Sequence, residues 1–350
     1  MRRFLAKGMF TLALSLSPGP FAGARPAPEP RRTLQIYFAD VEGGQSTLFV
    51  TPEGRSLLID TGWPDNDGRD ADRIAAAAKD AGIKKIDFVL ITHYHADHAG
   101  GAPQLAAKIP VGTFIDHGEN GETKGEVTKQ VFAAYQQLLA SGKYKHITAK
   151  PGQVLPIPGM QVRVVTADGE LIERPLPGGG KENANCADAA KPPADDSENP
   201  RSLGTLITFG KLRILDLGDL TGDKEMQLMC PRNKIGAVDI YVASHHGTAT
   251  SGTPLLVYAI APRVVIMDNG AKKGGSPEAW SVIEKSPGLA DLWQLHYSEA
   301  GGSEHNAAAP FLANLEGPDT GNYLKITAST DGSFEVLNSR TRETKKYAAR

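Results

Sequence analysis

The sequence is poor in cysteine. Among 350 residues only Cys186 and Cys230 carry thiols, and they form neither a Cys-x-x-Cys pair nor a cysteine–histidine spacing. This pattern argues against a zinc site built from thiolates. In an oxidising compartment the two cysteines would form one disulfide, and otherwise they are unrelated thiols, one buried and one exposed. The sequence leaves this choice open.

Long hydrophobic runs and an excess of positive charge are lacking too. Beyond the N-terminus no apolar stretch approaches the ~20 residues that a membrane span needs. Lysine and arginine number 38 against 40 aspartates and glutamates, which gives a formal charge of −2. We therefore expect no membrane span in the mature chain. A nucleic-acid partner stays open, but the charge does not support it.

The N-terminus has the pattern of a secretion signal. Three positive residues, an apolar stretch over residues 9–16 and a small-residue cleavage site ending at Ala24 follow one another. A disordered tail or a short membrane anchor is the alternative. We expect a signal peptide over residues 1–24, a proline-rich linker over 25–32, and a periplasmic or secreted protein.

Hydrophobic periodicity predicts two similar halves. In the first half, strands are expected at residues 34–38, 45–50 and 56–59, a helix over 70–81 and a buried strand at 86–91. In the second half, a hairpin of 203–209 and 212–216 is followed by alternating strands and helices, and a last hairpin surrounds residues 331–332. Because each half runs from strands into βα units, we expect an α/β (αββα) sandwich. Its two mixed β-sheets would pack face to face with helices outside, as a single domain over 33–350.

The strongest chemical signal directly follows the strand at 86–91. Four metal-capable side chains lie within six residues there: His93, His95, Asp97 and His98. Imidazole nitrogens and carboxylate oxygens are suitable ligands for zinc and related cations. His93 and His95 point the same way while the backbone is extended. Asp97 and His98 fall in the following turn and helix start, where they can reach a second metal.

This His-x-His-x-Asp-His motif resembles the hallmark of the metallo-β-lactamase fold superfamily, and the resemblance covers nearly the whole mature chain. It implies that Asp60, at an early strand end, orients the metal ligands and supports catalysis. Asp97 would bind the second metal and orient the attacking hydroxide. Asp219, after a strand-end glycine, would bridge the two metals. Asp216 is the alternative candidate for the carboxylate that bridges the metals. Its other possible role is to cap the turn.

The resemblance places the last metal ligand in the segment 244–247, which contains two histidines. We favour His245, because it is closer to the strand end, and this leaves His246 near the substrate or behind the ligands. Many superfamily members supply a third histidine to the first metal from the loop before the Gly-Asp strand. In this chain Asn199 and Ser202 are found there instead. We therefore expect a first metal site that is weakened or completed by water.

Several other polar residues have two open assignments each. His117 follows another expected strand and is either a substrate-side residue or a plain loop residue. His305 lies near a glycine pair, in a loop that covers the site or simply on the surface. Lys272 and Lys273 either attract an anionic substrate group or form a solvated turn.

Within the superfamily, four segments resemble the hydrolase domain of ComEC-type competence proteins, which are membrane DNA-uptake proteins: residues 41–46, 199–203, 218–220 and 245–248. The sequence contains no membrane-channel region, so a role in DNA uptake is not expected. The resemblance implies an exported metal-dependent hydrolase acting on a phosphodiester or related phosphate ester. The alternatives are a β-lactam or lactone hydrolase and a non-catalytic metal-binding interaction protein.

The expected cofactor is zinc, as two ions, with manganese or iron as alternatives because His and Asp ligands also suit those metals. Two ions about 3.5–4 Å apart would lower the pKa of a shared water to about 7. No residue is assigned to an organic cofactor. The expected partner is a small-molecule or phosphodiester substrate, and the sequence says nothing of oligomeric state.

Overall fold

The computed structural model describes residues 1, 33–64, 66–187 and 189–350. The signal peptide and linker expected over residues 1–32 lie outside these described residues, apart from Met1. The described residues from 33 onward belong to one compact unit. No helix among the described residues is long and apolar enough to cross a membrane.

The first sheet takes strands from both ends of the described chain. Its strand order is β18-β17-β16-β1-β2-β3-β4-β5-β6. The strands β1 to β3 form the antiparallel meander that the sequence predicts, and β3 to β6 are parallel. The bounds are β1 Leu34–Phe38, β2 Thr47–Val50, β3 Ser56–Ile59, β4 Ile86–Leu90, β5 Val111–Asp116, β6 Lys145–Thr148, β16 Leu324–Ala328, β17 Phe334–Asn338 and β18 Thr344–Tyr347.

The second sheet is built from the middle of the chain, in the order β15-β14-β13-β12-β11-β10-β8-β7, with β9 paired to β8. The hairpin β10–β11 is antiparallel, and the strands from β11 to β15 are parallel. The bounds are β7 Val154–Leu155, β8 Gln161–Ala167, β9 Glu170–Leu171, β10 Gly204–Phe209, β11 Leu212–Asp216, β12 Ile240–Val242, β13 Val264–Met267, β14 Asp291–His296 and β15 Leu312–Asn314.

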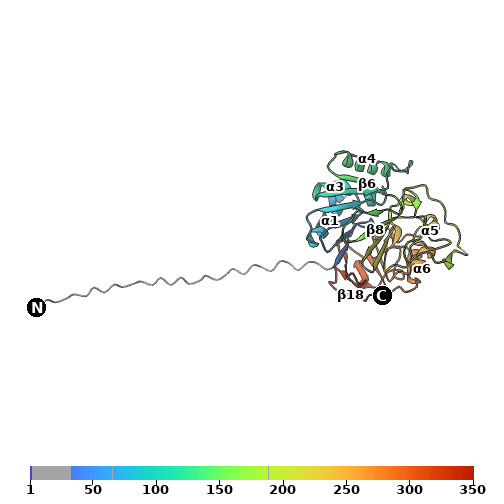
Figure 1. Cartoon of the computed structure of the whole chain (residues 1–350). Coiled ribbons are helices and arrows are strands. Elements are labelled where there is room, and N and C mark those ends of the chain that lie inside the picture. Colours follow the sequence, from blue (N-terminus) through green and yellow to red (C-terminus); the bar gives the residue numbers. More distant parts are fainter. Residues whose placement is uncertain (2–32, 65, 188) are drawn as a thin grey trace. The chain divides into compact units, whose positions relative to one another are not determined.

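Helices cover the outer face of each sheet. Figure 1 shows α1, α3 and α4 on one side of the molecule and α5 and α6 on the other. The helices are α1 Arg69–Asp80, α2 Ala96–Ala99, α3 Ala102–Lys108, α4 Glu126–Ala140, α5 Gly222–Met229, α6 Pro254–Ile260 and α7 Pro277–Glu284. Short 3₁₀ turns are η1 Asn66–Gly68, η2 Ala184–Cys186, η3 Asn199–Arg201, η4 Ser244–Gly247 and η5 Ala309–Phe311.

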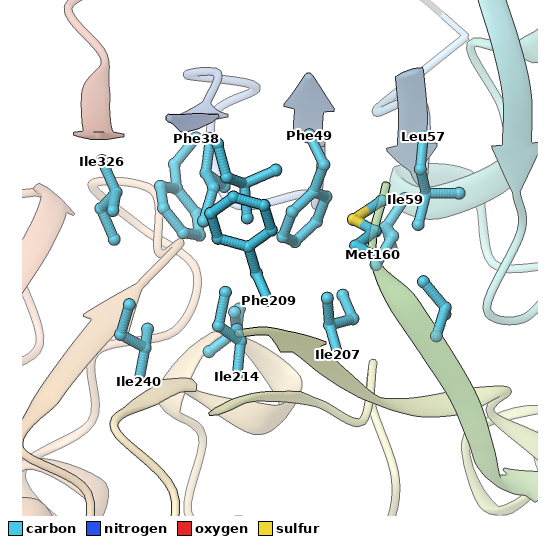
Figure 2. Close-up of a cluster of buried hydrophobic side chains, with 14 of the residues drawn as sticks. Phe38, Phe49, Leu57, Ile59, Met160, Ile207, Phe209, Ile214, Ile240 and Ile326 are labelled. Atoms are coloured by element: carbon cyan, nitrogen blue, oxygen red, sulfur yellow. The ribbon is translucent and has the colours of Figure 1, made fainter. Parts of the chain in front are cut away.

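Three apolar clusters explain this layering. The central cluster lies between the sheets, where Phe38 and Phe49 of the first sheet meet Ile207 and Ile214 of the second (Figure 2). Side chains alternate along a strand, so Tyr37 of β1 points instead to the outer cluster with α1, α3 and α4. A third cluster joins the second sheet to α5, α6 and α7. The expected αββα sandwich of two mixed sheets is confirmed.

Some strands begin at other residues than predicted, or are not predicted at all. The strand expected from Gln45 begins at Thr47, because the Gln45 N–H donates to the Asp97 carbonyl and its own carbonyl accepts from Gly62. The hairpin around residues 331–332 is the β16–β17 pair. No strand is predicted at β18, because it is exposed along most of its length and therefore has no hydrophobic alternation.

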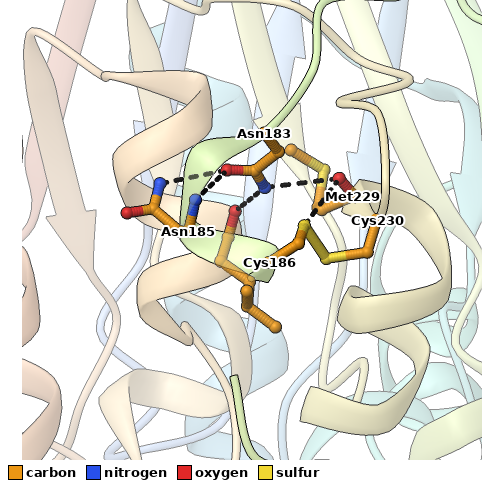
Figure 3. The surroundings of a disulfide bond; sticks show 6 residues. Asn183, Asn185, Cys186, Met229 and Cys230 are labelled. Carbon is orange, nitrogen blue, oxygen red and sulfur yellow. Dashed lines mark hydrogen bonds between the residues drawn. A yellow bond between two sulfur atoms is a disulfide. The ribbon is translucent and has the colours of Figure 1, made fainter. Parts of the chain in front are cut away.

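The two cysteines are joined in a disulfide across a sequence separation of 44 residues. It connects the long loop after β9 to the end of α5 (Figure 3). Beside it, the Asn183 side chain donates to the carbonyl oxygens of Met229 and Leu255. The loop before β10 is thereby attached to the helices of the second sheet.

Candidate metal centre

The motif after β4 places its side chains in two directions, as the sequence predicts from its position. His95 still has extended backbone (φ −66°, ψ 155°) and precedes α2, whose first turn contains Asp97 and His98. His93 Nε2 and His95 Nδ1 converge to 3.0 Å. Two imidazoles from the strand end and two ligands from the helix start therefore meet in one buried region.

Asp219 brings the other sheet to this region. The turn after β11 contains Gly218 in a left-handed conformation (φ 55°), where a Cβ would lie 2.9 Å from the Thr92 side chain. Asp219 Oδ2 lies 3.9 Å from His93 Nε2, and Oδ1 lies 3.2 Å from His98 Nε2. One carboxylate thus faces both sets of ligands.

Two ligand groups result, and they share this carboxylate. In each group the ligand atoms all lie within 4.8 Å of one another. The first group is His93, His95 and Asp219, and the second is Asp97, His98, Asp219 and His246. His98 Nε2 and His246 Nε2 approach to 3.1 Å, and no hydrogen bond reaches the buried Asp219 Oδ1. Converging nitrogens around an unsatisfied carboxylate oxygen are a donor set that fits a metal ion.

Outer residues fix which imidazole nitrogen faces inward. His98 Nδ1 lies 2.7 Å from Asp60 Oδ2, and the Thr92 hydroxyl donates to the same oxygen at 2.6 Å. His95 Nε2 lies 2.9 Å from Glu122 Oε2. An N–H that points to a carboxylate leaves the other ring nitrogen with its lone pair free for a metal. Asp60 thus occupies the outer position expected of it, and Glu122 is a further outer residue that is not predicted from the sequence.

The charges of the centre are strongly coupled. Burial opposes a charged Asp219, but His98, His246 and His245 outweigh it and lower its pKa well below the usual value. Burial likewise opposes the His98 imidazolium, yet Asp219, Asp97 and Asp60 raise its pKa well above 6.5. For His93, burial and the neighbouring histidines lower the pKa. Metal binding must therefore displace protons, chiefly from the histidines beside carboxylates.

Of the two histidines in η4, His246 rather than the favoured His245 belongs to the second ligand group. His246 is fully buried, and its Nε2 lies 3.2 Å from Asp97 Oδ2, within the second group. Both histidines have left-handed backbone, with φ of 54° and 56°. Strand geometry ends before this turn, so distance from the strand does not decide which imidazole reaches Asp97. On its other side, His246 Nδ1 lies 3.4 Å from Asp268 Oδ1 at the end of β13.

The remaining candidates lie outside the two ligand groups. His117 is buried against Glu198, with His117 Nε2 2.9 Å from Glu198 Oε2. Asn199 is buried in η3, and its side-chain oxygen has no hydrogen-bond partner. His305 packs edge-on against Trp280. Asp216 accepts from the Gly218 N–H and from Gln45, which is the capping assignment.

A third set of potential ligands, Asp40, Glu42 and His296, is occupied by its own ion pairs. Asp40 Oδ2 lies 2.9 Å from Arg73 Nη1, and Asp40 Oδ1 lies 2.6 Å from His296 Nε2. A guanidinium within this set disfavours a second cation there. We assign it to the connection between β1 and β14.

A cation lies at the rim of the centre. The Lys273 ammonium pairs with Asp97 and lies 5.2 Å from the centroid of the Trp63 ring. Its loop, after β13, approaches the loop after β1 so closely that a Cβ on Gly43 would lie 2.9 Å from the Gly270 nitrogen. Of the two open assignments for Lys273, the structure places it beside the ligands rather than in a solvated turn.

Comparison with known proteins identifies related sequences. Residues 40–181 match the family model of the metallo-beta-lactamase superfamily. A "UPF0173 metal-dependent hydrolase" of Polynucleobacter asymbioticus is 29% identical over 169 residues, 46% of this chain and 51% of that protein. "Recombination protein 2" of Haemophilus influenzae is 24% identical over 259 residues, 72% of this chain and 26% of that protein. The chain thus spans about half of the first relative and about a quarter of the second.

Among solved structures, the metallo-beta-lactamase fold protein YhfI from Bacillus subtilis has a TM-score of 0.46 and 12% identity, and the match covers 75% of this chain and 96% of that one. "Ribonuclease Z" of Alkaliphilus oremlandii is 37% identical over 64 residues, 18% of each protein. The matched region of the family model contains Asp60 and the whole His93–His98 motif. Residues 40–181 of this chain are therefore similar to the metallo-beta-lactamase superfamily, and this region holds the first half of the metal centre.

Proposed function

We propose that this chain is an exported hydrolase that cleaves a phosphodiester or related phosphate ester with two metal ions. The observation that carries the proposal is the shared carboxylate, because Asp219 faces one ligand group with each oxygen. Paired metal sites of this kind suit displacement at phosphorus, since they stabilise both the attacking and the leaving oxygen. The similarity to Ribonuclease Z over 64 residues supports a phosphate-ester substrate.

The bound metals would supply an activated hydroxide and a Lewis acid. His93, His95 and Asp219 would bind one ion, and Asp97, His98, Asp219 and His246 the other. His98 and Lys273 lower the pKa of Asp97 well below 3.8 in spite of its burial, so Asp97 is ionised at neutral pH. An ionised Asp97 can accept a hydrogen bond from the attacking water and orient it. Both cysteines are in the disulfide, so neither offers a thiolate nucleophile.

Lys273 would recognise the charge of the substrate. Its ammonium lies at the edge of the second group, over the Trp63 ring. A phosphodiester carries one negative charge next to the bond that breaks, and a cation at this rim would bind and position it. The adjacent Lys272 is exposed and serves as the matched control.

We propose zinc as the metal, with manganese or iron as the alternatives, because the donors are imidazoles and carboxylates. Metal analysis of the purified protein after dialysis tests this. Two zinc ions per chain are expected. Fewer than one tightly bound metal, unchanged by His95→Ala, would instead favour a non-catalytic interaction protein.

The substrate class is tested by a panel of bis-p-nitrophenyl phosphate, single-stranded DNA, nitrocefin and an acyl-lactone. We expect turnover of the phosphodiesters, abolished in His98→Ala. Lys273→Ala should raise KM for the anionic phosphodiester, and Lys272→Ala should not. If only nitrocefin or the lactone is hydrolysed, the phosphodiester assignment is wrong and a cyclic amide or ester is the substrate.

Export is proposed on two grounds. The N-terminal pattern is typical of a signal peptide, and Cys186 and Cys230 are joined in a disulfide, which persists in oxidising compartments. The test is N-terminal sequencing of the protein recovered from fractionated bacterial cells. Periplasmic or secreted protein that begins at Arg25 is expected, whereas cytoplasmic protein that retains Met1 would contradict the proposal.

A further inference from the structure

The two ligand groups are unequal. The second has four residues, and the first has only His93, His95 and the shared Asp219. The loop before β10 provides no third histidine, since Asn199 and Ser202 are found there. A residue that could complete the first group must therefore come from elsewhere, and it must approach Asp219 from the Oδ2 side, where His93 lies.

His245 approaches from that side. Its Nε2 lies 3.5 Å from Asp219 Oδ2, whereas His246 Nε2 lies 3.4 Å from Asp219 Oδ1. The two adjacent imidazoles thus lie on opposite oxygens of one carboxylate. His93 and His245 flank Oδ2, and His98 and His246 flank Oδ1.

The backbone around His245 fixes this arrangement. The His245 N–H donates to the Gly218 carbonyl at 3.1 Å, next to Asp219 in sequence. His245, His246 and Gly247 are all left-handed, with φ of 54°, 56° and 74°. For residues with a side chain this conformation is sterically strained. Strain of this kind persists where the surrounding structure uses it, most often at functional sites.

The outer ring nitrogen of His245 is also held by a contact. His245 Nδ1 lies 3.0 Å from the Thr250 hydroxyl, so Nε2 is the nitrogen that faces Asp219. Its side chain is 19% exposed, whereas that of His246 is fully buried. In this structure His245 Nε2 does not lie within 4.8 Å of every ligand atom of the first group. Rotation about the side-chain torsions, which this exposure permits, would bring the ring inward.

We propose that His245 is the third histidine ligand of the first metal site, in place of the histidine that the loop before β10 lacks. The histidine pair then serves two metals, with His245 on the ion of His93 and His95 and His246 on the ion of Asp97 and His98. The proposal rests on the two-metal site of the proposed function, but it is independent of the substrate.

The test counts metals in the purified full chain by mass spectrometry and measures their affinity against a chromophoric chelator. The wild type should bind two zinc ions and His245→Ala one. The double variant His95→Ala/His245→Ala should also retain one, because both residues serve the same ion. His245→Ala/His246→Ala should retain none. His305→Ala, which changes a histidine outside the ligand groups, should retain two.

Two further measurements separate a ligand from a structural residue. Far-ultraviolet circular dichroism should match the wild type, and His245→Gln should lose the same ion as His245→Ala. With cobalt in place of zinc, His245→Ala should remove the visible absorption of one site only. His245→Ala with two ions at unchanged affinity, or His95→Ala/His245→Ala with none, would overturn the proposal. If two metals bind as expected and no phosphodiester is hydrolysed, the proposed substrate fails while this assignment stands.

Discussion

The first and second halves of the chain supply the metal centre in different ways. The first half places His93, His95, Asp97 and His98 in one strand-to-helix junction, and none of these four residues has a positive φ. The second half contributes Asp219 and the histidine pair from two separate turns, each of which contains left-handed residues. Regular geometry is sufficient for the first set, whereas the second depends on left-handed turns, at Gly218 and at His245–Gly247, and on packing between distant segments.

The groups that contact the outer ring nitrogens of the histidines also differ. Carboxylates contact the histidines of the first half, Asp60 at His98 and Glu122 at His95. In the second half, His246 Nδ1 faces the Asp268 carboxylate at 3.4 Å, whereas His245 meets only a neutral hydroxyl, that of Thr250. The loop of Thr250 depends in turn on the buried Glu225, which accepts the backbone N–H groups of Gly252 and Thr253. His245 therefore depends on the fold of its loop, whereas His95, His98 and His246 each face a carboxylate.

The sharpest test of the comparison changes the residue that joins both groups. Asp219→Asn should remove both metals and lower activity by at least about 10³-fold, roughly 4 kcal/mol, because both ions lose a charged ligand. Metal content and phosphodiesterase rate measure this. Asp216→Asn, three residues earlier and outside both groups, is the control and should retain two ions. Two metals in Asp219→Asn would show that the halves bind independently.

The disulfide gives a second test, because both cysteines of the chain lie in the second half. Cys186→Ser/Cys230→Ser should lower the free energy of unfolding by roughly 4 kcal/mol, the loop-closure value for a separation of this size. Urea denaturation of the metal-loaded protein measures the change. Dithiothreitol should lower the free energy of unfolding of the wild type by the same amount and leave that of the variant unchanged. An unchanged midpoint would mean that packing alone fixes the second half.

Glu225 makes the support of the second half pH-dependent. Burial raises its pKa from 4.5 to about 7, against the opposing effect of the Thr253 and Gly252 N–H groups. A folded-state pKa above the unfolded one favours folding below pH 4.5, and this contribution is lost as the pH rises through about 7. This contribution to the free energy of unfolding amounts to about 3 kcal/mol at most.

In Glu225→Gln this part of the pH dependence should disappear. Unfolding free energies between pH 4.5 and 8, at saturating metal, should therefore fall less steeply than in the wild type. Glu278→Gln, at an exposed position of α7, is the matched control. An identical slope in the wild type and Glu225→Gln would contradict the assignment.

The smallest expected effect concerns the outer carboxylates of the first half. Glu122→Gln and Asp60→Asn should each weaken metal binding by about 10–100-fold, because they orient His95 and His98 without touching the ion. Competition with a chelator measures the affinity. Glu119→Gln, exposed in the same loop as Glu122, should leave it unchanged. Equal effects of Thr250→Val and Asp60→Asn would remove the difference between the halves.

The fold and the first half of the centre could be predicted from sequence because both follow from periodicity and local spacing. Alternation along β1 and β2 and the apolar strand β4 determine the two layers, and the motif residues fall at fixed offsets from the end of β4. Strand geometry ends at η4, however, so the choice between His245 and His246 could not be made by distance from the strand. Gly247 was the local signal that a tight turn follows.

Glu122 and Lys273 depend on tertiary contacts for which no spacing rule exists. Glu122 lies 27 residues from His95 in sequence. A partial signal was present, because it follows β5, the parallel neighbour of β4, and the carboxyl ends of parallel strands meet at one edge. Lys273 lies 176 residues from Asp97, and its sequence context alone favours a solvated turn slightly more than a substrate contact.

The left-handed turn at 245–247 also limits how this chain can vary. A Cβ at Gly247 would lie 2.7 Å from the end of the Met267 side chain, and the residue has φ 74°. Gly247 has no side chain to bind a metal, yet its positive φ disfavours any residue with a side chain in the turn that carries both histidines. In a library of random variants selected for metal retention, position 247 should tolerate as few amino acids as the ligand positions themselves. Selection for metal binding would then restrict a residue that does not itself bind the metal.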